Sequence, residues 1–362
     1  MNDVISSKAT QRLTSLDAFR GIIMISLISH GFGFSAFEGH SFLGFLAHHT
    51  EHVEWSGCVY WDLIQPAFMF MVGVAMPFAF AKRLSKGDTH AKIFIHSILR
   101  CFKLVLLAAL FSSIHSGSPT WNLVNVLPQI AFGYLATMLI LNMGLLKQGV
   151  IALLIVFIYT IVWIMYPGNS PDGPWVMGNV NMGSDFDLWL MGKHYSGYWI
   201  ALNAIPSTAT IIAGAMCGKL IASDRTHKQV MTIFAIAAAV LIACGLGLSF
   251  YIPIIKRILS TSFALYSTGW AILLLLFFYW FIDVLGYKRW CFFMVVVGMN
   301  SITAYVIFQL FRGWINSSIL VFTSFIVTPM GAYGTVLQAF LVLGAQWYIL
   351  YFFYKNKIFF KV

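Results

Sequence analysis

The chain has 362 residues, of which 60% are hydrophobic and only 9% are charged, and its formal net charge is +10. Ordinary soluble domains carry about 25% charged residues, so this composition excludes a water-soluble globular protein. The positive charge does not indicate nucleic-acid binding, because the basic residues are spread over short connections between apolar runs and form no patch. The five cysteines form no disulfide framework.

Apolar runs of about 20 residues, the length that spans a bilayer, recur along the chain. They predict an all-α polytopic bundle of about ten transmembrane helices, forming a single domain over residues 1–362. A shorter apolar stretch from Asn316 to Thr328 predicts a re-entrant or interfacial helix, or an eleventh span. The ten expected spans lie at about 18–36, 60–81, 93–114, 122–142, 149–166, 200–222, 229–251, 262–284, 289–312 and 333–354.

The basic residues of the connections set the expected orientation. With the N-terminus inside, most of them fall in the inner connections, and the outer connections hold only Lys193, Lys256, Arg257 and Arg312. This distribution satisfies the positive-inside rule and predicts that both termini are cytoplasmic.

Histidines are concentrated near the expected outer face, and five of the ten precede residue 53: His30, His40, His48, His49 and His52. A neutral imidazole accepts a proton near pH 7, so this region is a candidate for general-base catalysis. The alternative is an interfacial loop that uses polar aromatic side chains. His48 and His52 would share a helical face and could hold a metal, but no third ligand follows at a fixed spacing, so no metal is predicted.

Charged residues inside apolar runs are the next candidates, because each is costly in hydrocarbon. Asp62, at the start of the second run, either caps that helix or orients His52. Arg100 and Lys103, on one face of the third run, either snorkel toward the inner surface or form a basic wall for a phosphate-bearing ligand. Arg20 could serve the same ligand or pair with Asp17.

Several blocks carry a resemblance to a known family. The segments RLTSLDAFRG (12–21) and EHVEWSGCVYWDLIQPAFMFMVGVAMPF (51–78) resemble the heparan-α-glucosaminide N-acetyltransferase family of the transmembrane acyltransferase superfamily, most closely its bacterial branch. Similarity continues in family order through IPIIKRILSTSFAL (252–265), GMNSITAYV (298–306) and KNKIFFKV (355–362). One departure is VLPQI (126–130), where many members of the family carry an arginine.

The resemblance implies transfer of an acetyl group from cytoplasmic acetyl-CoA to an amino sugar or another glycan on the far side of the membrane, with no metal. It places the active-site histidine at His52 and the following aspartate at Asp62. His52 would act as a base for direct attack, or would itself be acetylated and pass the group on. Glu54 and Trp55 of the same motif are expected at the substrate, and Asn300 either lines this cavity or serves as a helix-packing amide.

Acetyl-CoA, a carbohydrate acceptor and the lipid bilayer are thus the expected partners, in a bacterial inner (cytoplasmic) membrane, and a homodimer is compatible with the sequence. Transfer to an amine is favoured over transfer to a hydroxyl. The main alternative is a transporter or flippase for a glycan or a small anionic solute, since carriers also bury charge among many spans. No inverted repeat is visible in the sequence, which favours the enzyme. A sensor or assembly partner without chemistry is a further alternative, and it predicts that His52 is dispensable.

Overall fold

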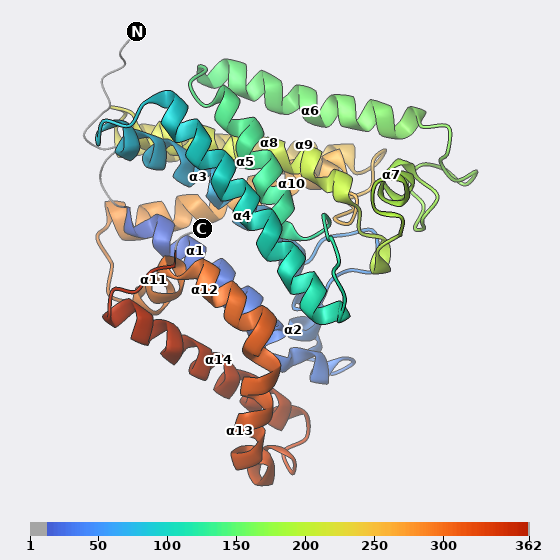
Figure 1. Cartoon of the computed structure of the whole chain (residues 1–362), viewed down its shortest axis with the longest axis vertical. Coiled ribbons are helices and arrows are strands. Elements are labelled where there is room, and N and C mark those ends of the chain that lie inside the picture. Colours follow the sequence, from blue (N-terminus) through green and yellow to red (C-terminus); the bar gives the residue numbers. More distant parts are fainter. Residues whose placement is uncertain (1–12, 361–362) are drawn as a thin grey trace. The chain divides into compact units, whose positions relative to one another are not determined.

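A computed structural model describes residues 13–360 of the chain (Figure 1). Within this range the chain forms helices and one isolated β-bridge, between Ser56 and Ile255, and no β-strand. Eight helices of the described part are long and apolar enough to cross a membrane, and a bent pair at the N-terminal end makes a ninth if it counts as one span. The protein is therefore an all-α polytopic membrane protein, as its composition predicts.

The division into spans differs from the prediction at two places. The expected span at 122–142 is a helix of only 15 residues, α5 (Val126–Ile140), which is shorter than a bilayer requires. The expected span at 289–312 is also wrong, because the helix breaks at Asn300 and a long apolar helix runs from Ser301 to Val327 instead. Asn300 has φ −117° and ψ 31°, a non-helical conformation that separates α11 from α12.

The described residues divide into two compact units, each assembled from separate stretches of the chain. Unit 1 contains Trp55–Gly57 and Gln65–Leu276, and unit 2 contains residues 13–54, 58–64 and 277–360. Helix α3 (Tyr60–Leu84) starts in unit 2 and continues in unit 1. The expectation of a single domain stays a prediction.

Unit 1 is built around α8, which packs against α5 and α6, while α4 packs against α5. Backbone contact between α3 and α8 depends on small residues: a Cβ at Gly73 would lie 1.9 Å from the carbonyl oxygen of Ile211, and one at Gly214 would lie 2.1 Å from that of Phe70. After α3, the elements of unit 1 are α4 (His90–Ser116), α5 (Val126–Ile140), α6 (Leu145–Met165), α7 (Met182–Met191), η3 (Ser196–Tyr198), η4 (Ala201–Asn203), α8 (Ala204–Ala222), α9 (His227–Leu248) and α10 (Thr261–Phe278) as far as Leu276.

Unit 2 combines both ends of the described chain, and its central contact joins α1 to α11. Glycines again allow the approach, since a Cβ at Gly21 or Gly298 would lie 1.9 Å from a carbonyl oxygen of the other helix. Helices α13 and α14 form an antiparallel hairpin, visible at the orange and red end of the chain in Figure 1. The elements of unit 2 are α1 (Thr14–Ser29), η2 (Gly31–Phe37), α2 (Gly44–His49), the start of α3, the π-helical turn η5 (Tyr279–Val284), α11 (Phe292–Met299), α12 (Ser301–Val306), the π-helical turn η6 (Ile307–Phe311), α13 (Arg312–Val327) and α14 (Ala332–Lys355).

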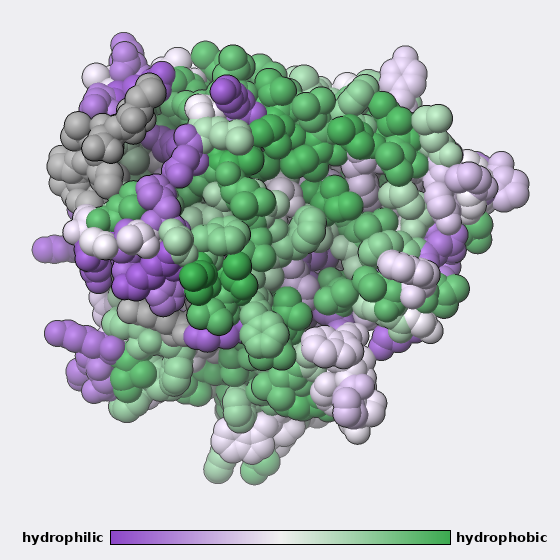
Figure 2. Space-filling view, turned by 45° about the horizontal axis from the view of Figure 1, so that its top comes forward, coloured by the Kyte–Doolittle hydropathy of each residue, from purple (hydrophilic) through white to green (hydrophobic). Residues whose placement is uncertain are grey.

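Large apolar side chains remain exposed on the helices, and they cover most of the face shown in Figure 2. On α13, for example, Val321, Phe322 and Phe325 are each more than 70% exposed. Such extensive apolar surface suits lipid rather than water. The predicted cytoplasmic position of the termini relies partly on Lys8, Arg12 and Lys361, which lie outside the described residues.

Candidate functional site

His52 and Asp62 meet in unit 2. The chain leaves the short helix α2 at His49, runs through a loop and begins α3 at Tyr60. This loop brings the Nδ1 atom of His52 within 2.8 Å of the Oδ1 atom of Asp62. The aspartate side chain is only 1% exposed, whereas the imidazole is 39% exposed. A buried carboxylate thus holds an imidazole that stays accessible.

Asp62 is itself held by the start of α3. Its Oδ2 atom accepts a hydrogen bond from the Val59 backbone N–H at 3.2 Å, and its own N–H donates to the Val59 carbonyl at 3.0 Å. The carboxylate therefore caps the first turn, where the helix dipole favours negative charge. The cap uses Oδ2 and the contact with His52 uses Oδ1. The Asp62 side chain can therefore cap α3 and orient His52 at the same time, the two roles that the sequence suggested as alternatives.

The pairing has a chemical consequence for His52. When Nδ1–H donates to the carboxylate, the lone pair of the neutral ring is on Nε2. The carboxylate also stabilises the imidazolium that forms when Nε2 takes a proton. This is the arrangement that a general base or a nucleophilic histidine requires.

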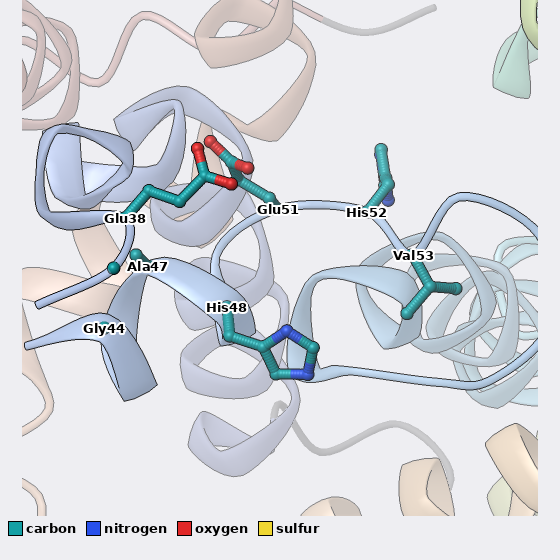
Figure 3. A pocket seen from close by; sticks show the side chains of 8 residues that line it. Glu38, Gly44, Ala47, His48, Glu51, His52 and Val53 are labelled. Atoms are coloured by element: carbon teal, nitrogen blue, oxygen red, sulfur yellow. The ribbon is translucent and has the colours of Figure 1, made fainter. Parts of the chain in front are cut away.

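His52 lines a cavity of about 240 Å³ in unit 2. Figure 3 shows that the carboxylates of Glu38 and Glu51 point toward one another on one side of it, while the His48 imidazole extends on another. All three come from the segment between α1 and α3, so one stretch of chain supplies the imidazoles and the acids. Two carboxylates beside a base make this cavity suited to a polar ligand that carries an amine.

Trp55 and Glu54, the other residues expected at the substrate, are placed differently from His52. Trp55 belongs to unit 1, where its indole Nε1–H donates to the Trp175 carbonyl at 2.8 Å and the ring packs against the buried cluster that contains Trp163. Glu54 belongs to unit 2 and is exposed, and it is not among the residues that line the His52 cavity. Contact of either residue with substrate stays a prediction.

The cationic residues expected at acetyl-CoA are divided between the units. Arg100 and Lys103 lie on α4 in unit 1, where the Arg100 guanidinium stacks 5.0 Å from the centroid of the Tyr134 ring and Lys103 is exposed. The Nε atom of Arg100 is buried and has no hydrogen-bond partner within residues 13–360. Arg20 is half-buried on α1 in unit 2. Their role in binding the donor stays a prediction.

The departure at VLPQI has a structural account. Gln129, which stands where many members of the resembling family carry arginine, is fully buried in unit 1. Its Oε1 atom accepts a hydrogen bond from Gln65 at 2.7 Å, and its Nε2 donates to the Val124 carbonyl at 2.9 Å. A neutral pair of side-chain amides, Gln65 and Gln129, therefore occupies the place of the charged arginine.

Asn300 is 2% exposed and sits at the break between α11 and α12 in unit 2. Neither its Oδ1 nor its Nδ2 has a hydrogen-bond partner among the described residues. The structure does not bring Asn300 into the lining of the His52 cavity. A buried amide without partners is costly, which sets it apart from an ordinary packing residue.

Sequence analysis did not single out Asp187 and Lys256, two buried charged residues of unit 1. Asp187, on α7, accepts the Ala201 N–H at 3.1 and 3.2 Å, and burial raises the pKa of its carboxyl to about 6. Lys256 is 4% exposed, and its Nζ lies 5.2 Å from the centroid of the Trp199 ring. For Lys256 the sequence signals were its place among the few outer basic residues and in the block 252–265, and neither indicates that its side chain is buried.

No group of three or more His, Cys, Asp or Glu side chains within residues 13–360 is placed to hold a metal ion. In a comparison with protein families, residues 12–163 match a model described as a domain of unknown function, DUF5009. The match covers less than half of the 362-residue chain and includes both His52 and Asp62. None of the curated proteins with which the chain was compared matches it.

Proposed function

We propose that the protein is a membrane-embedded acyltransferase that moves an acetyl group from acetyl-CoA to an amino sugar or another glycan. The observation that carries the proposal is the pair of His52 and Asp62, 2.8 Å apart, beside a cavity that His52 lines. The family resemblance of the motif around His52 supports acetyl-CoA as the donor. A bacterial inner membrane, with the acceptor on its outer side, is the proposed setting.

In the direct route, the acceptor nitrogen attacks the thioester carbonyl carbon while Nε2 of His52 takes a proton from that nitrogen. A new C–N bond forms, the C–S bond breaks, and the imidazolium returns the proton to the departing thiolate as CoA–SH. In the two-step route, Nε2 itself attacks the carbonyl and CoA leaves as the thiolate, which takes a proton from solvent. The acceptor nitrogen then attacks the acetyl carbonyl carbon, the bond between that carbon and Nε2 breaks to regenerate His52, and the proton lost by the acceptor goes to solvent. Asp62 stabilises positive charge on the ring in both routes.

An amine is the proposed acceptor group because Glu38 and Glu51 line the same cavity as His52. Carboxylates attract an amino sugar in its protonated form and exclude anionic competitors, and the bound ammonium group loses one proton to solvent before its nitrogen attacks. The candidates for contact with the CoA phosphates remain Arg100 and Lys103 in unit 1 and Arg20 in unit 2, since guanidinium and ammonium groups are the usual phosphate ligands.

The test is CoA release from acetyl-CoA by detergent-purified full-length protein, with and without glucosamine and related amino sugars. We expect release that depends on the sugar and falls by about 10² to 10⁴-fold in His52→Ala, the usual contribution of a general base. His49→Ala is the matched control, because His49 is a nearby histidine whose ring contacts Phe45 at an interplanar angle of 54° and does not line the cavity. Normal turnover by His52→Ala would overturn the proposal.

The transporter alternative gives a different result in the same preparation. In proteoliposomes, a carrier would move labelled glucosamine or a small anion across the bilayer without consuming acetyl-CoA. An acyltransferase would release CoA in proportion to acetylated product. Mass spectrometry of that product distinguishes an amide from an ester, and therefore transfer to nitrogen from transfer to oxygen.

A further inference from the structure

Unit 2 contains a second and larger cavity, of about 560 Å³, whose lining residues are distinct from those of the His52 cavity. It lies among η2, α13 and α14, and its lining includes His30, which joins α1 to η2. Its polar lining side chains are His30, Ser35, Arg312, Asn316, Thr335 and Gln338, together with Thr328. No aspartate or glutamate lines it. The cavity therefore offers hydrogen-bond donors and a cation without a carboxylate to neutralise them.

Arg312 is the central charge of this cavity. It begins α13 immediately after the π-helical turn η6, a type of distortion that often occurs at functional sites. Its Nε atom is buried and has no hydrogen-bond partner, and no carboxylate within residues 13–360 forms an ion pair with it. A guanidinium in an apolar helix is costly when unpaired, so an anion from outside the chain would supply the missing partner.

Asn316 lies four residues after Arg312 and so shares its face of α13. Gln338 of α14 donates its Nε2 to the Asn316 carbonyl at 3.1 Å and to the Asn316 Oδ1 at 3.2 Å, while its Oε1 accepts from Thr323 at 2.8 Å. Because the Asn316 side-chain oxygen is engaged by Gln338, its amide N–H groups are the donors that remain to the cavity. The Gln338 network thus orients donors and joins α13 to α14.

Close backbone approach completes the cavity. A Cβ at Gly334 would lie 1.8 Å from the Val327 carbonyl oxygen, and one at Gly33 would lie 2.9 Å from that of Thr335. Gly331 and Thr335 at the cavity belong to the first turn of α14, which has no acidic residue and no side-chain cap. The last turn of α13 and the first turn of α14 both reach the cavity, so their opposite dipole ends offset one another and Arg312 remains its main positive charge.

We infer that this cavity binds a phosphate group, either in the headgroup of a lipid or in a sugar phosphate. The lining supplies a guanidinium and neutral donors from η2, α13 and α14 without a carboxylate, which suits the several acceptor oxygens of a phosphate group. The volume falls within the range of about 300 to 1,000 Å³ for small-molecule sites, so it accommodates the group that carries the phosphate as well. The inference does not depend on the acyltransferase proposal, because it uses none of the residues of the His52 cavity.

The test is equilibrium binding to full-length protein in an uncharged detergent, at low ionic strength and without phosphate buffer. One arm uses glucose 6-phosphate with glucose as its uncharged counterpart, and the other uses dihexanoyl phosphatidylglycerol with dihexanoylglycerol. We expect at least one phosphate ligand to bind in preference to its uncharged counterpart, and the arm that binds identifies the source. Arg312→Gln should weaken that binding at least about 10-fold, as loss of a charge-assisted hydrogen bond does.

Two further variants make the result specific. Thr335→Val keeps the volume of the side chain and removes one donor, so a loss of about 3- to 5-fold is expected. Arg289→Gln is the matched control, since Arg289 is an exposed arginine of unit 2 outside the cavity, and it should leave affinity unchanged. Gel filtration and thermal melting establish that each variant is folded. Wild-type affinity in folded Arg312→Gln, or no preference for phosphate in either arm, would overturn the inference.

Discussion

The cavity lined by His52 and the larger cavity lined by Arg312, called the Arg312 cavity below, both lie in unit 2 and contain opposite kinds of charged group. Glu38 and Glu51 line the His52 cavity, whereas the Arg312 cavity contains a guanidinium and no carboxylate. The first is formed by short elements and loops between α1 and α3, and the second mainly by the long helices α13 and α14. One compact unit therefore offers one surface for a cationic group and another for an anionic group.

This difference indicates a division of work within unit 2. A loop can place an imidazole and its carboxylate at the distance that chemistry needs, and functional residues are common on loops for that reason. Helices held together by close glycine contacts provide a rigid frame, which can hold the groups of a binding site in a fixed geometry. We therefore expect substitutions at the His52 cavity to change turnover and substitutions at the Arg312 cavity to change affinity for phosphate.

Among changes that keep His52 in place, the largest effect is expected from Asp62→Asn, which leaves the shape of the His52 cavity intact. The Asn amide can donate to Nδ1 of His52 and so favour the tautomer whose Nε2 carries a proton. We expect kcat/KM to fall about 10²-fold, with CoA binding unchanged. Because the imidazolium loses a neighbouring negative charge, the acid limb of the pH profile of kcat/KM should shift to lower pH.

A purely structural role for Asp62 makes a different prediction. Loss of the cap alone would lower the melting temperature and the yield of folded protein without moving the pH profile of the active fraction. Asp62→Glu, which keeps the charge but alters the reach of the carboxylate, should retain the wild-type pH profile at reduced rate. An unshifted profile in folded Asp62→Asn would contradict the positioning role.

A smaller effect is expected at the second cavity from Gln338→Leu. This change preserves side-chain volume approximately and removes the hydrogen bonds that Gln338 donates to Asn316 and accepts from Thr323. Affinity for the phosphate ligand should fall about 5- to 10-fold because the Asn316 amide loses its fixed orientation. Binding is measured as for Arg312→Gln, and CoA release at saturating amino sugar should stay at the wild-type level.

Gln346→Leu is the matched control for this change. Gln346 is also a buried glutamine of α14, and it does not line the Arg312 cavity. Its amide atoms have no hydrogen-bond partner within the described chain, so its replacement removes no observed bond. If Gln346→Leu weakened phosphate binding as much as Gln338→Leu, a general disturbance of α14 would explain both results.

Sequence reasoning succeeded where the signal was local or compositional. Apolar runs of bilayer length predict helices directly, because lipid leaves the backbone few alternatives. The separation of His52 and Asp62 by ten residues allowed a loop to fold back onto the start of a helix, and the structure contains that contact. The acyl-transfer chemistry rests on resemblance and stays a prediction.

Other features required the three-dimensional arrangement. The sequence places Arg312 only in a connection, because Gln338 and Gly33, which share its cavity, lie far away along the chain. Hydrophobic periodicity does not locate the break at Asn300, since the helical stretches on both sides are predominantly apolar. An apolar helix face can contact either lipid or another helix, and the sequence does not show which. The division into two units depends on which helices contact one another, so it was not predictable either.

The smallest expected effect distinguishes two glutamates that lie three residues apart. Glu51 lines the His52 cavity, whereas Glu54, which the sequence motif favours as a substrate contact, does not. If the acidic lining attracts a protonated amine, Glu51→Gln should raise KM for glucosamine about 3-fold, the scale of one exposed charge contact, with little change in kcat. The increase should shrink at high salt and disappear for an acceptor without an amine, because no charge attraction is then lost. Glu54→Gln should leave KM unchanged. The reverse pattern, with KM raised only by Glu54→Gln, would mean that the acceptor lies outside the cavity that His52 lines.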